Sequence, residues 1–335
     1  MSDQADFRLG RGTVGDISAL VIADEPSGTS VAIATTGATL LSWRTPAAGA
    51  TRELVDGYRD RAELLAQAGV RSGIMAPFTN RIRDARYAVA GVVHDLSSGA
   101  KGEPPALLHG LVRDSRFAPV EAIATSDSFM LRLRNQSLKD AGFVGYPFAY
   151  EVDVVYVVRR SGIEMEIVSR NFGDEPIPVA TGWHPYLTLG APVDQLVLTV
   201  PAARVVVTDD ALIPLGGGAA FRDIEGGDPL DYRAPRRIGS GVIDACFVDL
   251  APDPDGRIRT SLENPAVGLA LDVWQERGAM HVYTADHLTR GARGALALEP
   301  VEAITDAFNR PDQRDVVMLE PGMVRAFRFG VEVRR

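Results

Sequence analysis

Hydrophobic and polar residues alternate with a period of two along much of this chain, and the pattern predicts β-strands. Segment 129–135 alternates without a break, and segments 148–158 and 163–169 are rich in β-branched and aromatic residues. The residues Arg-Arg-Ser-Gly between the last two segments predict a hairpin connection. Further strands are expected at 30–36, 39–43, 195–200, 204–208, 246–250, 268–274, 280–284 and 295–298.

Few other elements interrupt this pattern. Segment 60–68 has the character of a helix, and segments 315–319 and 324–333 are expected to close the chain as a hairpin around Glu-Pro-Gly-Met. Many short strands broken by 33 glycines and 21 prolines indicate an all-β fold. No composition shift, long linker or fixed-period repeat divides the chain. We therefore expect residues 1–335 to form a single domain, a large antiparallel β-sandwich.

Composition narrows the functional classes. The hydrophobic fraction of 46% in 335 residues is enough for a large core without a disulfide or a structural metal. The single cysteine, Cys246, cannot form an intramolecular disulfide and is expected to be buried. A net charge of −9 argues against a nucleic-acid partner. The polar N-terminus and the absence of a stretch of ~20 apolar residues predict a cytoplasmic protein without a membrane partner.

Two motifs in the sequence lack the context that their usual functions need. Gly-Arg-Gly-Thr-Val-Gly at 10–15 matches a dinucleotide-binding pattern, but no buried strand precedes it and no helix follows, so a turn is expected. Asp-Pro-Asp-Gly at 253–256 lacks the later ligands of a calcium loop and is expected to be an acidic surface turn. The five histidines do not show zinc-binding spacings. We therefore expect no metal and no organic cofactor.

Three residues in distinctive settings are candidates for chemistry. His109 precedes a glycine, where backbone approaches a ligand closely, and His184 lies between Trp183 and Pro185. Glu299 ends an apolar strand, so its charge requires a partner or a function. Each residue alone also fits a structural role, as a hydrogen-bonded core histidine or as a carboxylate that caps backbone amides.

Taken together and in order, these segments resemble the aldose 1-epimerase (galactose mutarotase-like) family. The matching segments are Gly-Ala-Thr-Leu-Leu-Ser at 37–42, Pro-Phe-Thr-Asn-Arg-Ile at 77–82, Leu-His-Gly at 108–110, Gly-Trp-His-Pro-Tyr-Leu at 182–187, Ile-Asp-Ala-Cys-Phe at 243–247, and Glu-Pro at 299–300 followed by Asp306 and Asn309. The resemblance implies a galactose mutarotase-like supersandwich and an isomerase that interconverts the α and β anomers of a hexose.

The resemblance also implies a role for each site residue. It assigns Glu299 as the base for the anomeric hydroxyl and His184 as the acid toward the ring oxygen, with His109 as a second imidazole near them. Arg81 and Asp244 would bind ring hydroxyls, and Asn80 would help to orient its loop. A carboxylate and an imidazole suit this reaction because one accepts and the other donates a proton near neutral pH. The expected partner is a small-molecule sugar.

Three alternatives to a neutral hexose epimerase remain open. The first is the same reaction on a sugar that carries a C6 anion, because after His109 the chain reads Gly-Leu-Val-Arg, which is closer to less characterised and hexose-6-phosphate relatives. Several arginines near the site motifs suit a phosphate or another anion at C6: Arg81, Arg83, Arg86, Arg113 and Arg116. The other two are a non-catalytic carbohydrate-binding protein and a glycoside hydrolase or lyase, which usually needs two carboxylates. The sequence does not predict an oligomeric state.

Overall fold

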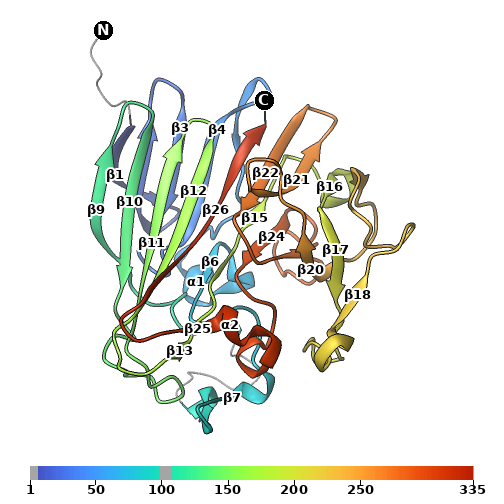
Figure 1. Ribbon diagram of the computed structural model, residues 1–335. Coiled ribbons are helices and arrows are strands. Elements are labelled where there is room, and N and C mark those ends of the chain that lie inside the picture. Colours follow the sequence, from blue (N-terminus) through green and yellow to red (C-terminus); the bar gives the residue numbers. More distant parts are fainter. Residues whose placement is uncertain (1–6, 99–107, 335) are drawn as a thin grey trace.

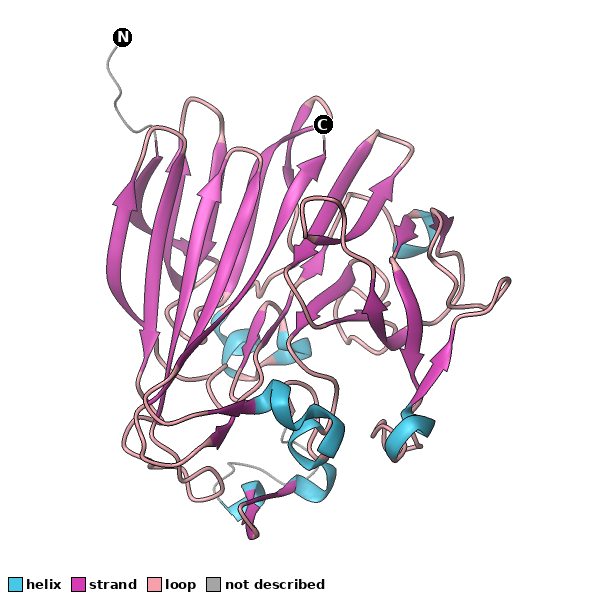
Figure 2. Cartoon of the chain, in the orientation of Figure 1, coloured by secondary structure: helices cyan, strands magenta, loops and turns pink. Residues whose placement is uncertain are grey.

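The computed structural model describes residues 7–98 and 108–334, and its fold is all-β as predicted. Strands account for 49% of the structure and helices for 9%. All pairs of named strands are antiparallel, in two large sheets, one five-stranded sheet and two short ribbons. The fold is therefore the large antiparallel β-sandwich that the alternating pattern predicts (Figures 1 and 2).

The N-terminal five-stranded sheet follows the order of the chain, with each strand paired to the next. Its strands are β1 (Phe7–Val14), β2 (Ile17–Asp24), β3 (Thr29–Ile33), β4 (Leu40–Ala47) and β5 (Ala50–Glu53). Glycines 10 and 12 of the dinucleotide-like motif lie inside β1, and Gly15 lies in the β1–β2 turn with a φ of +56°. The expectation of a turn was therefore right for Gly15 alone, because the first two glycines lie within a paired strand.

The largest sheet has nine strands in the order β19-β16-β21-β22-β26-β12-β11-β10-β9. The strands are β9 (Ala118–Ala124), β10 (Ser128–Asn135), β11 (Tyr150–Arg159), β12 (Gly162–Asn171), β16 (Val197–Thr199), β19 (Arg236–Arg237), β21 (Ile258–Asn264), β22 (Leu269–Gln275) and β26 (Val324–Arg334). The predicted hairpin at 148–169 is β11 and β12, whose pairing runs from Tyr150–Asn171 to Arg159–Gly162. The long strands of this sheet run side by side in Figure 1.

The other large sheet carries the site. Its order is β18-β17-β20-β23-β24-β14-β6, and β15 also pairs with β24. The strands are β6 (Gly73–Met75), β14 (Gly182–His184), β15 (Tyr186–Leu187), β17 (Ala202–Val206), β18 (Phe221–Asp223), β20 (Asp244–Leu250), β23 (Ala279–Tyr283) and β24 (Leu296–Val301). Four of these strands come from segments that the alternating pattern predicted as strands: β17, β20, β23 and β24.

The remaining elements are short. Two ribbons pair β7 (Arg86–Val89) with β8 (Val92–Asp95) and β13 (Ile177–Pro178) with β25 (Met318–Leu319). The α-helices are α1 (Arg61–Leu65) and α2 (Arg314–Val317). Single 3₁₀ turns are η1 (Ala68–Val70), η2 (Arg83–Ala85), η3 (Leu96–Ser98), η4 (Val193–Gln195), η5 (Gly217–Ala220), η6 (Ala307–Asn309) and η7 (Pro311–Gln313).

The predicted helix is present but shorter than expected. Asp60 caps α1 by accepting a hydrogen bond from the Glu63 backbone N–H at 2.8 Å, and Glu63 Oε2 accepts one from the Arg59 N–H at 3.0 Å. Gln67 then adopts a left-handed conformation with a φ of +51°, which ends the helical run before Ala68. The acidic turn at 253–256 is confirmed by a hydrogen bond from the Gly256 N–H to the Asp253 carbonyl at 2.8 Å.

The closing hairpin was predicted wrongly. Residues Arg314–Val317 form α2, and β25 pairs with β13 instead of with β26. Strand β26 lies between β12 and β22, so both of its edges are already paired. Arg325 on β26 also donates to the Val316 carbonyl at 2.7 Å, which satisfies a carbonyl of the short helix. Local alternation could not reveal that distant strands occupy both edges of β26.

Packing between the sheets forms one large hydrophobic cluster that draws residues from both large sheets and from the five-stranded sheet. Trp183 on β14 stacks on Phe329 of β26, with ring centroids 5.8 Å apart. Tyr156 on β11 donates a hydrogen bond to the Ala38 carbonyl at 2.6 Å, which joins the nine-stranded sheet to the segment before β4. Cys246 is buried, as predicted.

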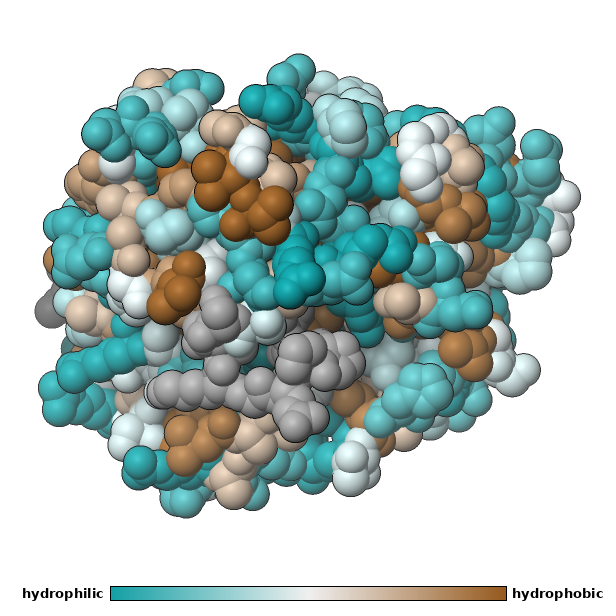
Figure 3. Space-filling model, turned by 90° about the horizontal axis from the view of Figure 1, so that it is seen from below, coloured by the Kyte–Doolittle hydropathy of each residue, from teal (hydrophilic) through white to brown (hydrophobic). Residues whose placement is uncertain are grey.

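None of the helices in residues 7–98 and 108–334 is long and apolar enough to span a membrane. On the face in Figure 3, hydrophobic side chains lie in small separate groups divided by hydrophilic ones.

Candidate active site

Four side chains form a row across neighbouring strands of the site-bearing sheet. Cys246 on β20 lies opposite His281 on β23, and His281 lies opposite Glu299 on β24. On the next strand, β14, His184 Nε2 lies 3.3 Å from Glu299 Oε1. Directly opposed residues of an antiparallel pair have Cβ atoms about 4.5–5.5 Å apart, so the side chains of the row interact.

Two loop segments bring further side chains to this row. The backbone N–H of His109 donates to the Asn80 carbonyl at 2.8 Å, and Leu108 pairs with Arg81. Asn80 and His109 both have left-handed backbones, with φ values of +52° and +63°. Gly110 follows at a φ of +81°, and a Cβ there would lie 2.2 Å from the Ala76 carbonyl oxygen. The His-Gly pair thus reflects a position where only glycine fits.

These segments surround an open pocket with a volume of about 290 Å³. All six residues singled out in the sequence line it: Asn80, Arg81, His109, His184, Asp244 and Glu299. The other lining residues are Gly69, Val70, Leu108, Tyr186, Leu212, His281, Tyr283, His287 and Leu288. The segments from residue 80 to residue 299 therefore meet at one site, and the roles of the six residues remain predictions.

Glu299 is a buried carboxylate with little to satisfy its charge. Its side chain is 3% exposed, and among the described residues its close polar contact is His184. Burial raises the pKa of Glu299 to about 7, with the positive charges of His281 and Arg81 acting in the opposite direction. The group is therefore half ionised near neutral pH. The alternative of a carboxylate that caps backbone amides does not fit these contacts.

The two predicted histidines have neutral rings. Burial, with the charge of His281 nearby, lowers the pKa of His184 to about 3, and burial holds that of His109 well below its usual range. Their ring centroids are 5.0 Å apart at an angle of 86°. The Nδ1 of His109 lies 2.8 Å from Met75 Sδ, whereas the Nδ1 of His184 is buried without a hydrogen-bond partner among the described residues.

His281 belongs to the site, although the sequence did not single it out. Its Nε2 lies 2.9 Å from Asp244 Oδ1. Burial opposes its charge, but Glu299, Asp244 and Cys246 together raise the pKa of His281 well above its usual value. The surrounding protein partly desolvates Asp244, although 41% of its side chain is exposed, and the hydrogen bond and charge of His281 nevertheless lower its pKa. No local signal distinguished His281, because its neighbours are ordinary strand residues.

Aromatic residues at the pocket are tyrosines. Tyr186 and Tyr283 line it, and the Tyr186 ring lies 5.0 Å from the His184 ring. The buried guanidinium of Arg71 lies 5.2 Å from the centre of the Tyr186 ring. Three large aromatic residues, Trp183, Phe247 and Trp274, are buried in the core and are not among the pocket-lining residues.

Of the five arginines considered for an anionic substrate, Arg81 alone is among the pocket-lining residues. Its Nη1 donates to Asn80 Oδ1 at 2.9 Å. Arg83 pairs with Asp209 at 2.7 Å and Arg86 with Asp95 at 3.0 Å. Arg113 donates to the Leu108 carbonyl at 3.1 Å and to Gln67 at 3.3 Å, and Arg116 is not among the lining residues.

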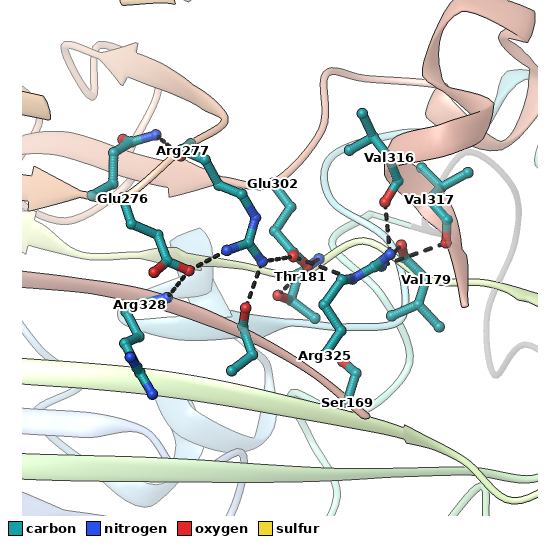
Figure 4. A network of polar contacts seen from close by, with 12 residues as sticks. Ser169, Val179, Thr181, Glu276, Arg277, Glu302, Val316, Val317, Arg325 and Arg328 are labelled. Atoms are coloured by element: carbon teal, nitrogen blue, oxygen red, sulfur yellow. Dashed lines mark hydrogen bonds and ion pairs between the residues drawn. The ribbon is translucent and has the colours of Figure 1, made fainter. Parts of the chain in front are cut away.

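A polar network around Glu302 joins the segments that flank β14 and β24 (Figure 4). Glu302 accepts hydrogen bonds from the Thr181 N–H at 2.9 Å, from Thr181 Oγ1 at 2.7 Å and from Arg277 Nη2 at 2.7 Å. Arg325 Nε lies 3.4 Å from the same carboxylate. Because Thr181 precedes β14 and Glu302 follows β24, the network fixes the strands that carry His184 and Glu299 against each other.

The two downstream residues of the family's glutamate motif support a loop. Asp306 Oδ1 accepts hydrogen bonds from the Arg83 N–H at 2.9 Å and from Asn309 Nδ2 at 2.7 Å. The Asp306 N–H donates to the Arg81 carbonyl at 2.8 Å. These residues therefore hold the segment that carries Arg81. In residues 7–98 and 108–334, no group of three or more His, Cys, Asp or Glu is placed to hold a metal ion.

The fold and the pocket define an antiparallel β-sandwich with carboxylates, imidazoles and one guanidinium in a single open site. The family model of the aldose 1-epimerases matches residues 19–331, and the chain belongs to this family of carbohydrate isomerases. The uncharacterized protein YihR from Escherichia coli (strain K12) is 26% identical over 264 residues, which is 78% of this chain and 79% of that protein.

Solved structures share the fold over nearly the whole chain. The GalM/aldose epimerase homologue from C. elegans has a TM-score of 0.78 at 20% identity and covers 98% of this chain and 99% of its own. The galactose 1-epimerase from Lactobacillus acidophilus NCFM has a TM-score of 0.80 at 15% identity, with 99% of both chains covered. At these identities the likeness establishes the galactose mutarotase-like fold.

Proposed function

We propose that this protein interconverts the α and β anomers of a hexose by acid–base opening and closing of the sugar ring. The observation that carries the proposal is the Glu299–His184 pair, a buried carboxylate and imidazole 3.3 Å apart in a pocket of about 290 Å³. Ring opening needs a proton acceptor at the anomeric hydroxyl and a donor at the ring oxygen. Closure after rotation about C1–C2 reverses both transfers.

Glu299 is the proposed base. Its pKa of about 7, raised by burial, suits this role because a base is most effective when its pKa lies near the working pH. The carboxylate takes the proton of the anomeric hydroxyl as the ring opens and returns it to the same oxygen when the ring closes on the other face. The reaction requires no net oxidation and consumes no co-reactant.

His184 is the proposed donor to the ring oxygen, with His109 beside it. Because burial lowers the pKa of His184 to about 3, its ring is neutral in the free protein and acts through a neutral N–H. A neutral imidazole is an effective donor to an oxygen that becomes negative during the reaction. The same geometry allows His109 to donate a second hydrogen bond near the ring oxygen.

Arg81 and Asp244 are the proposed ligands of the ring hydroxyls. A guanidinium offers several donors and a carboxylate several acceptors, so the two residues together suit vicinal hydroxyl groups. Asn80, which accepts a hydrogen bond from Arg81, orients that guanidinium. These contacts form in the ground state and the transition state alike, so they contribute mainly to binding.

A neutral hexose is favoured over a hexose 6-phosphate. A phosphate site ordinarily gathers several donors, and four of the five candidate arginines are not among the pocket-lining residues. Two of these four, Arg83 and Arg86, are paired with carboxylates. Arg81 also shares the pocket with the carboxylates of Asp244 and Glu299, which oppose a doubly charged group.

The test is polarimetry of freshly dissolved α-sugars, corrected for spontaneous mutarotation, with neutral hexoses and hexoses that carry an anion at C6 compared side by side. Glu299→Gln keeps the shape of the side chain but cannot accept the proton, and His184→Asn cannot pass one to the ring oxygen. We expect each substitution to lower kcat by roughly 10²-fold or more with little change in KM.

Circular dichroism must first show that both variants fold. A folded Glu299→Gln enzyme with near wild-type turnover would contradict the proposed base and favour a protein that only binds carbohydrate. Faster turnover of the C6-anionic sugars than of the neutral ones would replace the proposed substrate while leaving the reaction in place.

A further inference from the structure

His281 occupies the centre of the row of side chains described above. It is opposite Cys246 on one side and opposite Glu299 on the other. Asp244, two residues before Cys246 on β20, points to the same face and meets the His281 ring at 2.9 Å. The ring therefore contacts the carboxylate of Asp244 and lies on the strand next to Glu299, and both carboxylates belong to the proposed reaction.

Titratable and charged groups from every neighbouring element surround this ring. Facing groups are Asp244 and Cys246 from β20, Tyr283 from β23 itself, Glu299 from β24, His184 from β14, and Arg81 and His109 from the two loop segments. Glu299, Asp244 and Cys246 raise the pKa of His281 well above its usual value against the effect of burial. Its positive charge in turn lowers the pKa of His184 and of His109.

We propose that His281 is a positioning residue of the site, whose charged ring is fixed by Asp244 and stabilises the ionised form of Glu299. The proposal rests on the proposed function, because it makes His281 responsible for the fraction of Glu299, the proposed base, that is ionised. Without the positive ring, the buried carboxylate of Glu299 would stand near the carboxylate of Asp244, whose side chain is 41% exposed, and each negative charge would disfavour the other. His281 thus allows a buried carboxylate to work as a base near neutral pH.

The first test does not depend on the sugar. The chain has five histidines, so their ring protons can be assigned by single substitutions and titrated by NMR. We expect His281 to titrate above the usual value of about 6.5, and Asp244→Asn to lower its midpoint by about one pH unit or more. A His281 midpoint at or below that value in the unmodified protein would overturn the proposal, whatever the enzyme turns over.

The second test uses the pH profile of kcat/KM. Glu299 works in its ionised form, so the profile rises as the pH passes through its pKa. His281→Gln removes the positive charge, which raises the pKa of Glu299, and we expect this rise to move to higher pH by about one unit. At two pH units above the new midpoint, the kcat/KM of His281→Gln should return to within a few-fold of the value for the unmodified enzyme. A variant with a merely structural defect would stay slow at every pH.

His94→Gln is the matched control, because His94 stacks on Tyr87 outside the pocket, with ring centroids 5.0 Å apart. It should leave the midpoint in place. An unmoved midpoint in folded His281→Gln, while Glu299→Gln is inactive, would overturn the role of His281 and leave the proposed function intact. Absence of turnover by the unmodified protein would instead contradict the proposed function. If His281→Gln does not fold, the Asp244→Asn titration still decides.

Discussion

Glu299 and Glu302 lie three residues apart and their side chains are equally buried, yet the two carboxylates have very different polar partners. Glu302 accepts hydrogen bonds from Thr181 and Arg277, and the guanidinium of Arg325 lies 3.4 Å away as an ion-pair partner. Glu299 has His184 at 3.3 Å, the cross-strand His281 and an open pocket. Burial therefore raises the pKa of Glu299 to about 7.

The difference separates a carboxylate that stabilises the fold from one that is available for chemistry. A buried charge with a full set of hydrogen bonds contributes to folding only while all its partners stay in place. A buried charge with few partners costs stability but can exchange a proton near neutral pH. The two glutamates thus predict opposite outcomes when each one is removed.

Glu302→Ala should produce the largest change in stability. It leaves Arg277 and Arg325 without their shared carboxylate and frees the Thr181 backbone N–H, so we expect a loss of about 3 kcal/mol in the free energy of unfolding. Chemical denaturation measures this loss. Glu263→Ala is the control, because the Glu263–Arg334 pair is exposed and should matter by less than about 1 kcal/mol. Equal effects of the two substitutions would show that the Glu302 network has no special role.

Glu299→Gln should change stability in the other direction. The folded pKa of about 7 lies above the unfolded value, so the wild-type carboxylate disfavours folding once the pH rises above ~4.3. Glutamine removes that cost, and we expect a gain on the order of 1–3 kcal/mol at pH 7 and none below pH 4. Unfolding curves at the two pH values measure it. A variant less stable than wild type at pH 7 would contradict the environment described for Glu299.

Exhaustive chelation should have the smallest effect. The proposed steps are proton transfers between the sugar, Glu299 and His184, so we expect turnover to be unchanged by EDTA. Polarimetry before and after dialysis against the chelator provides the measurement. Activity that is lost with EDTA and returns with a divalent ion would show that the proposed proton-transfer scheme is incomplete.

Much of the fold could be predicted from the chain because its strands are half-buried and alternate visibly. Segment 129–135 is an example, since it matches β10 almost to the residue. Prediction failed at 315–319, where a few hydrophobic residues suit a strand and a helical turn equally. Segment 315–319 could not pair with β26, because strands from distant parts of the chain already occupy both edges of β26.

The same limit applies to the site. His109 and His184 stood beside glycine or proline, and Glu299 was a charge directly after an apolar run, so local sequence pointed to them. In the structure Glu299 lies inside β24, which continues to Val301. His281 lies in an ordinary strand, and its importance comes from neighbours on β20 and β24. Conversely, Arg83 and Arg86 are close to Arg81 in sequence, yet they pair with Asp209 and Asp95.

The central place of β26 has a consequence for how the molecule folds. This strand joins β12 to β22, so it links the two halves of the nine-stranded sheet. Its partner β12 comes from much earlier in the chain, and closing such a long loop is slow. Until β26 inserts, both neighbours expose unpaired edges that invite association with other chains. We therefore expect refolding to be slow, limited by insertion of β26, and prone to aggregation at high protein concentration.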